Sequence, residues 1–161
     1  MPHYSIRQNK EGRVVYRKIL DLDDRLQQAV RSGWFEYLRS IQKGAQKSIR
    51  AKDKRGRLRI VRNPKTGRRK RHRSSAPGQS HARMFGKLGD SISWKVHGWD
   101  KASFGYGVST TATKAAPPYA GAIEFGSSKR RIAARPTLQN AIDAEDPQPH
   151  WDTAIAREFP F

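Results

Sequence analysis

Apolar residues recur at steps of three and four positions across residues 22–49, and this spacing predicts one long amphipathic helix. The stripe consists of Leu22, Leu26, Ala29, Val30, Trp34, Tyr37, Leu38, Ile41, Ala45 and Ile49. We expect the helix to cover residues 21–50, with Asp21 as its N-cap. Because most helical stability comes from packing of the apolar face, Leu26 and Leu38 are expected in the core.

The charge of the chain is strongly basic and unevenly distributed. Its 161 residues include 33 Lys and Arg against 14 Asp and Glu, a net charge of +19. The segment Arg50–Arg73 alone holds 13 of the basic residues and a single acid, Asp53. Such a concentration of charge indicates an anionic partner, which nucleic acid, an anionic membrane or an acidic protein surface can provide.

Composition excludes several classes of protein. Cysteine is absent, which rules out a disulfide scaffold, a Cys-based zinc site and a thiol nucleophile. No apolar run approaches the ~18 residues of a membrane span, so we expect no membrane partner. The first residues contain no apolar signal region behind a basic one, which predicts a cytoplasmic product.

The basic segment is predicted to form a projecting β-hairpin arm, with disorder as the alternative. Residues 57–62 partly alternate between apolar and basic side chains, and Asn63–Gly67 has turn composition. Residues 68–73 can return as a second strand, but they contain no apolar side chain and cannot be a core strand. The residues expected to contact DNA or a partner protein are Arg57, Arg59, Arg62, Lys65, Arg68, Arg69, Lys70, Arg71 and Arg73.

The type of nucleic-acid contact is limited by what the basic segment lacks. No aromatic residue lies between positions 50 and 73, which argues against stacking on single-stranded bases. The segment also lacks the periodicity of a recognition helix, so sequence-specific readout is not supported. Non-specific contact with phosphates remains open, as does docking on an acidic protein.

The remaining elements predict an α+β fold. A short hairpin is expected over residues 4–19, and strands over residues 91–96, 104–110 and 119–125 are expected to form an antiparallel meander. A second, shorter helix is expected to begin at Pro136. Together these elements predict an antiparallel sheet packed against the long N-terminal helix and the shorter helix. We expect one α+β domain over residues 1–146, which includes the basic arm at 50–73, and a C-terminal hydrophobic tail over 147–161.

Catalytic chemistry is not expected from this sequence, and neither are a bound metal or a cofactor. There is no glycine-rich phosphate loop, and no two histidines have metal-ligand spacing on one element. His72 and His81 lie near the basic segment and raise the weaker possibility of a small nuclease. Glu124 is the one acid within the otherwise apolar stretch Tyr119–Gly126. It is expected to accept hydrogen bonds or an ion pair near Arg135, because a buried carboxylate needs partners.

Three stretches together resemble one family. They are Ser74–Ser80 followed by Gly86–Ile92, then Tyr119–Gly126 with its Glu124-Phe125-Gly126, and finally Ala134–Leu138 followed by Ala141. Their order and spacing are similar to the phage neck proteins of the gene-ten-like family of lambdoid tailed phages, over residues 22–145. His81 stands near the usual place of a second proline, and Thr137 replaces an aromatic residue. The tail after Pro147 has no counterpart in the family.

The resemblance implies a structural virion protein of the head–tail junction, of the tail-completion or tail-terminator type. Such a protein forms a homo-oligomeric ring around the DNA channel, between portal or adaptor, stopper and tail-tube proteins, and has no catalytic centre. Residues expected to serve structure or assembly are Glu124, Arg135, Pro136, Trp151, Phe159 and Phe161. The alternative is a free-standing basic protein that binds nucleic acid without sequence specificity.

Overall fold

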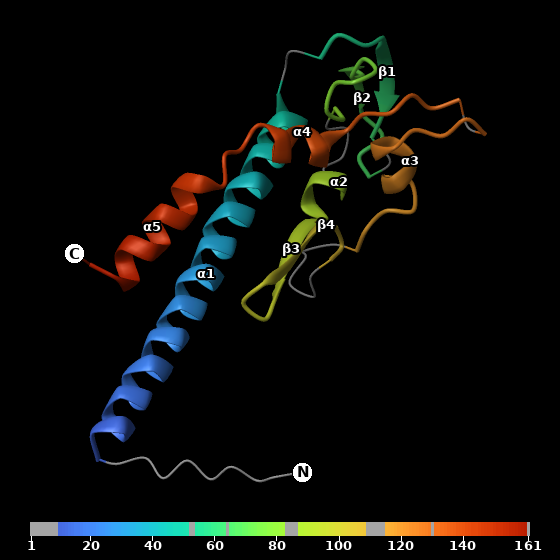
Figure 1. The fold of residues 1–161 in the computed structure, drawn as a ribbon. Coiled ribbons are helices and arrows are strands. Elements are labelled where there is room, and N and C mark those ends of the chain that lie inside the picture. The colour runs from blue at the N-terminus through green and yellow to red at the C-terminus, as the bar shows by residue number, and fades with distance from the viewer. Residues whose placement is uncertain are drawn as a thin grey trace, which may run out of the picture.

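A computed structural model describes residues 10–51, 54–63, 65–82, 87–108, 115–129 and 131–160. One long helix, α1 (Lys10–Arg50), is followed by two separate two-stranded sheets and four short helices (Figure 1). The fold is therefore α+β, as predicted. None of the described helices is long and apolar enough to cross a membrane.

The helix α1 confirms the predicted helix over 21–50 but begins eleven residues earlier, at Lys10. The hairpin expected over residues 4–19 is wrong from Lys10 onward, and its first residues lie outside the described part of the chain. Each residue added to a helix gains one backbone hydrogen bond, whereas the described residues contain no strand that pairs with Val14–Ile19. The β-propensity of these residues is therefore overridden. Asp21 consequently lies inside the helix and is not an N-cap.

The core lies at the C-terminal half of α1. Ile41, Ala45 and Ile49 form a buried cluster with Ile92 and Ala141, against which Tyr37, Phe104, Tyr106 and Leu138 pack. Leu38 is buried as expected, with 3% of its surface exposed, but Leu26 is 48% exposed. The first turns of α1 extend beyond the rest of the fold (Figure 1), and α5 reaches along the helix only as far as Arg25. Leu26 therefore lies at the edge of the covered part of α1, outside the core.

The two sheets are β1 (Leu58–Arg62) with β2 (Arg69–Arg73), and β3 (Ile92–His97) with β4 (Lys101–Tyr106). Both are antiparallel, and the short helix α2 (Lys87–Asp90) precedes β3. The sheet β3–β4 packs on α1, where Gln42 donates through Nε2 to the Ile92 carbonyl at 2.7 Å.

The third strand of the predicted meander is wrong. Residues 119–125 contain the helix α3 (Ala120–Glu124), in which Ile123 N–H donates to the Tyr119 carbonyl at 3.0 Å. Two of the alternating positions are Ala120 and Ala122, and alanine favours helix over strand. Residues 109–114, which include the end of the predicted strand 104–110, lie outside the described residues.

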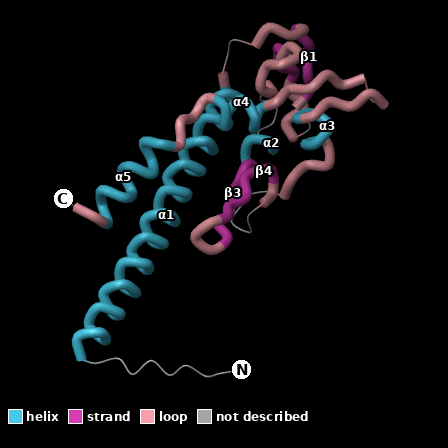
Figure 2. Tube along the Cα trace, in the orientation of Figure 1, coloured by secondary structure: helices cyan, strands magenta, loops and turns pink. Residues whose placement is uncertain are grey.

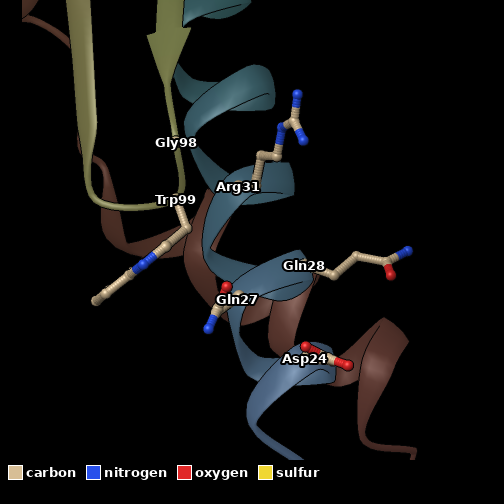
Figure 3. A pocket seen from close by; sticks show the side chains of 6 residues that line it. All are labelled: Asp24, Gln27, Gln28, Arg31, Gly98 and Trp99. Carbon is tan, nitrogen blue, oxygen red and sulfur yellow. The ribbon is translucent and has the colours of Figure 1, made fainter. Parts of the chain in front are cut away.

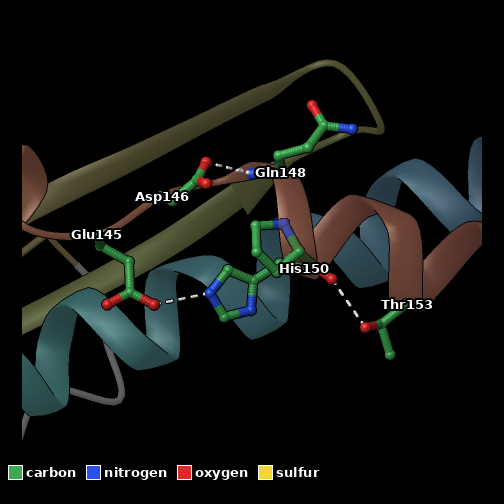
Figure 4. Close-up of polar contacts among 6 residues, drawn as sticks. Glu145, Asp146, Gln148, His150 and Thr153 are labelled. Carbon is green, nitrogen blue, oxygen red and sulfur yellow. Dashed lines mark hydrogen bonds and ion pairs between the residues drawn. The ribbon is translucent and has the colours of Figure 1, made fainter.

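Two further helices complete the fold, α4 (Thr137–Asp143) and α5 (Gln148–Glu158). The link between them is short and polar: Asp146 accepts from the Gln148 N–H at 3.0 Å, and Glu145 contacts His150 Nε2 at 2.7 Å (Figure 4). Hydrogen bonds from Ser40 and then His150 lower the pKa of Glu145. These contacts turn the chain so that α5 runs back along α1 (Figure 2).

The C-terminal tail docks on α1 rather than on a sheet. Trp151 lies edge-on to Trp34, with ring centroids 5.2 Å apart, and Arg157 pairs with Glu36 at 2.8 Å. Near the end of α5, Arg25 donates to the Glu158 carbonyl, and its guanidinium stacks over Phe159 at 4.7 Å. Trp151 and Phe159, which were predicted to serve structure or assembly, thus contact α1 of the same chain. Phe161 lies outside the described residues.

Candidate functional site

The predicted basic hairpin is present as strands β1 and β2. Leu58 pairs with Arg73, and the register continues to Arg62 opposite Arg69. The connection is closed by hydrogen bonds from Asn63 N–H to the Arg68 carbonyl and from Gly67 N–H to the Asn63 carbonyl, both 2.9 Å. Gly67 has a φ of 68°, which glycine adopts without a steric penalty. The turn composition of residues 63–67 is therefore what closes this hairpin.

The hairpin has two unlike faces because successive side chains of a strand point to opposite sides. One face, which we call the arginine face, consists of Leu58, Ile60, Arg62, Arg69, Arg71 and Arg73. All six are exposed, and Ile60 has 71% of its surface in solvent. The opposite face carries Arg59, Val61, Lys70 and His72, of which Val61 and His72 are half-buried.

The cations of the hairpin have no carboxylate partners among the described residues, where the ion pairs of α5 involve Glu36 and Glu145 instead. The sequence explains this, since no Asp or Glu occurs between Asp53 and Asp90. The predicted contact residues Arg57, Arg59, Arg62, Lys65, Arg68, Arg69, Lys70, Arg71 and Arg73 are all exposed. The hairpin is therefore a concentrated positive charge that nothing in the described chain neutralises.

The base of the hairpin is fixed to the loop that follows it. Gly56 N–H donates to the Ser74 carbonyl at 2.8 Å, and Ser74 N–H donates to the Arg57 carbonyl at 3.0 Å. The side-chain oxygen of Gln79 accepts from the N–H groups of Arg55 and Ala76, both at 3.0 Å. The strands thus rise from a hydrogen-bonded platform formed by residues 74–82.

That platform is attached to the start of α4. Gly78 N–H donates to the Ala134 carbonyl at 3.1 Å, and His81 N–H donates to Thr137 Oγ1 at 3.0 Å. Arg135 donates from Nε to the Ser75 carbonyl at 3.4 Å. The predicted assembly residue Arg135 therefore contacts the platform, and Pro136 occupies the N-cap position of α4.

Glu124 holds the start of α4 through hydrogen bonds. Only 4% of its surface is exposed, and its Oε1 accepts from the N–H groups of Leu138 at 2.8 Å and Gln139 at 3.3 Å. Its Oε2 accepts from Thr137 N–H at 3.0 Å and from the Tyr106 hydroxyl at 2.9 Å. Glu124 was expected to accept from donors near Arg135. Its donors are backbone N–H groups of that region and, in addition, the Tyr106 hydroxyl. A carboxylate here satisfies the N–H groups that begin α4.

Burial, together with the negative charge of Glu124, raises the pKa of the Tyr106 hydroxyl. Tyr106 consequently remains protonated and acts as a donor to the carboxylate at neutral pH. These contacts join the end of β4, the end of α3 and the start of α4 at one point. The polar cluster has a structural role, because its groups are hydrogen-bonded to one another and hold these elements together.

Lowering the pH should destabilise the fold through His81. Burial, followed by the positive charges of Arg135, His72 and Lys54, lowers the pKa of His81 to about 4, while the unfolded value is ~6.5. Between these values the unfolded chain binds a proton that the folded chain does not bind. The stability is therefore fully present above pH ~6.5 and falls as the pH drops toward ~4, by about 2–3 kcal/mol.

Urea unfolding at several pH values measures this effect. We expect His81→Gln to flatten the pH profile across the window between ~6.5 and ~4. The matched control is His97→Gln, because His97 is exposed and contacts only Ser103 at 3.0 Å among the hydrogen bonds described. An unchanged slope in His81→Gln would show that this imidazole does not set the acid response.

An open hollow lies between α1 and the β3–β4 turn. It is lined by Asp24, Gln27, Gln28, Arg31, Gly98 and Trp99 (Figure 3). The lining contains no nucleophile with an adjacent base, and the described residues contain no group of three His, Asp or Glu side chains placed to hold a metal ion.

The exposed apolar half of α1 is a feature that sequence reasoning missed. Large side chains with 46–59% of their surface in solvent gather there, namely Val14, Val15, Tyr16, Ile19, Leu20, Leu22 and Leu26. The sequence signal was a helical apolar stripe longer than the fold behind it can cover.

No family model, curated protein or solved structure matches the chain in comparisons with known proteins.

Proposed function

We propose that this protein is a structural component of the phage head–tail connector, which forms a homo-oligomeric ring around the DNA channel. The observation that carries the proposal is the convergence of the three segments that resemble the neck family. The platform loop contacts Ala134 and Thr137, and Glu124 of the second segment accepts from the first N–H groups of α4. The three stretches that resemble the family are separate in the sequence, but they contact one another in the fold. This agrees with a shared structural role and supports the proposal.

Ring formation is further supported by the exposed half of α1. Contiguous apolar surface of this kind marks an interaction site in a soluble protein. In a homo-oligomer the neighbouring subunit covers such a surface, and a chain with an otherwise modest core gains burial in this way. The helix α1 is also the most extended element of the fold, and it reaches well beyond α5 (Figure 1).

The second candidate is a free-standing basic protein that binds nucleic acid. The unpaired cations of the hairpin favour it, since phosphate neutralisation supplies most non-specific affinity. This candidate leaves the apolar half of α1 without a role. The oligomeric state therefore distinguishes the two functions.

Native mass spectrometry and negative-stain microscopy test the proposal, with two variants that each place one acid on α1. Ile19→Asp should release subunits from the ring, because it replaces an apolar contact worth about 1.5–3 kcal/mol per subunit. Gln28→Asp is the matched control, since Gln28 is exposed but polar in the native chain. A parent protein that stays monomeric at all concentrations, with both variants behaving alike, would contradict ring formation.

A further inference from the structure

We propose that the arginine face of the hairpin binds the sugar–phosphate backbone of double-stranded DNA, which lies along the direction of β1 and β2. The inference rests on the proposed function for the source of the DNA, the duplex in the channel. It goes further by naming the partner of the hairpin and the face that makes the contact. The opposite face is excluded as the main contact because Val61 and His72 are half-buried there.

The arrangement of the arginines fits a linear polyanion. Arg69, Arg71 and Arg73 occupy alternate positions of β2 and point to one side, so neighbouring guanidinium groups leave the strand at intervals of about 7 Å and the row spans about 14 Å. Arg62 lies beside the row on β1, opposite Arg69, and its Nε donates to the Gly67 carbonyl at 3.1 Å. Phosphates follow one another regularly along a DNA strand, whereas carboxylates on a protein surface are scattered.

The chemistry of the side chains also favours phosphate. Arginine presents a planar set of donors that matches two phosphate oxygens at once, and each strand position on this row is arginine rather than lysine. The sheet is a two-stranded ribbon, a form of backbone that fits a DNA groove. An exposed ribbon of this shape with a single row of arginines is thus equipped for a duplex.

Leu58 and Ile60 lie beside the arginine row and supply an apolar contact. In the register Ile60 is opposite Arg71, and Leu58 is opposite Arg73. Aliphatic side chains next to the arginines can pack on the deoxyribose rings that link successive phosphates. Single-stranded DNA is disfavoured as the partner, because no aromatic residue in the basic segment offers a base a stacking surface.

Two double variants of the intact protein test the assignment, and each removes two positive charges from the strands. Arg69→Gln with Arg71→Gln alters the arginine face, and Arg59→Gln with Lys70→Gln alters the opposite face. Binding is measured by fluorescence anisotropy with a duplex of about 30 base pairs at several salt concentrations. Circular dichroism and thermal melting establish that both variants fold, as expected for exposed charges.

The arginine-face variant should bind the duplex about tenfold or more weakly, and the slope of log affinity against log salt should fall by about 2. The opposite-face variant should lose less than about threefold, and Ile60→Ser should weaken binding with the salt slope unchanged. Equal losses in the two double variants would overturn the proposal, because affinity would then follow net charge alone. Tighter binding of a single strand of equal length would also overturn it.

An acidic protein partner is a further outcome that would overturn the proposal. It is tested with a polyglutamate peptide, which should bind more weakly than the duplex and without preference for either face. A peptide that competes fully with the duplex and depends on Arg69 and Arg71 would reassign the face to a protein. Measuring the oligomeric mass of the same samples separates the proposals: rings that do not bind DNA contradict only this one, and monomers that bind it contradict only the ring.

Discussion

Replacing Gly33 by alanine should detach α5 from α1. A Cβ atom built on Gly33 lies 2.0 Å from Cε3 of the Trp151 indole and 2.4 Å from its Cζ3. Contacts this short cannot be relieved by small adjustments, because Trp151 is also held edge-on against Trp34. The indole has to move away from Gly33, and the expected loss of unfolding free energy is on the order of 2–4 kcal/mol. Urea unfolding followed by tryptophan fluorescence measures this loss.

The matched control is the other glycine in the C-terminal part of α1, Gly44. A Cβ on Gly44 meets nothing within 4 Å, so Gly44→Ala should stabilise the protein by about 0.5–1 kcal/mol through helix propensity alone. In a Trp151→Ala background the Gly33→Ala change should lose most of its cost, since the clashing ring is gone. If Gly33→Ala stabilised the parent as Gly44→Ala does, α5 would not dock as described.

Local patterns in the sequence predicted the elements whose signals are self-contained. The stripe from Leu22 to Ile49 needed only helical spacing, and the turn at Asn63–Gly67 needed only its own composition and the positive φ of Gly67. Helix α4 likewise follows an Arg135-Pro136 start. In each case the nearby residues decide the outcome, so tertiary packing refines these elements without changing their type.

The elements that were predicted wrongly depend on contacts between distant residues. Residues 119–125 contain two alanines that favour a helix, and the helix also places Glu124 where it accepts from the N–H groups of residues 137–139. Alternation in a short apolar run does not separate the two. Leu26 was expected in the core because periodicity shows which face is apolar, but it does not show where along a helix the covering elements stop.

The candidate site was predicted in part for the same reason. The charged residues of the hairpin were identified from composition, because a cluster without acids has no local means of neutralisation. Which of them share a face follows from the pairing of Leu58 with Arg73, and a shift by one residue would exchange the faces. The partners of Glu124 were predicted only as donors near Arg135, since a backbone N–H leaves no mark in the sequence.

Replacing Glu124 by glutamine should destabilise the protein strongly, although the two side chains have the same shape. Oε1 accepts from two backbone N–H groups, so an amide nitrogen at that position faces two donors that it cannot satisfy. At the Oε2 position an amide nitrogen still faces the Thr137 N–H, although the Tyr106 hydroxyl can rotate and accept from it. The group is buried, and the loss of its charge also removes a favourable interaction with the first turn of α4. We expect a cost of about 3–5 kcal/mol, measured by urea or thermal unfolding.

Glu36→Gln makes the same chemical change at an exposed ion pair, where Arg157 lies 2.8 Å away, and should cost at most about 1 kcal/mol. Tyr106→Phe removes one of the donors to Glu124, so it should cost less in the Glu124→Gln background than in the parent. Hydrogen exchange should locate the damage. The amides of residues 137–139 should exchange faster because they lose their acceptor, and the platform bonded to Thr137 and Ala134 should then exchange faster as well. Since the hairpin rises from that platform, its arginine face should become more mobile even where the protein stays folded. Parental exchange rates at residues 137–139 in Glu124→Gln would show that this carboxylate is not what fastens α4.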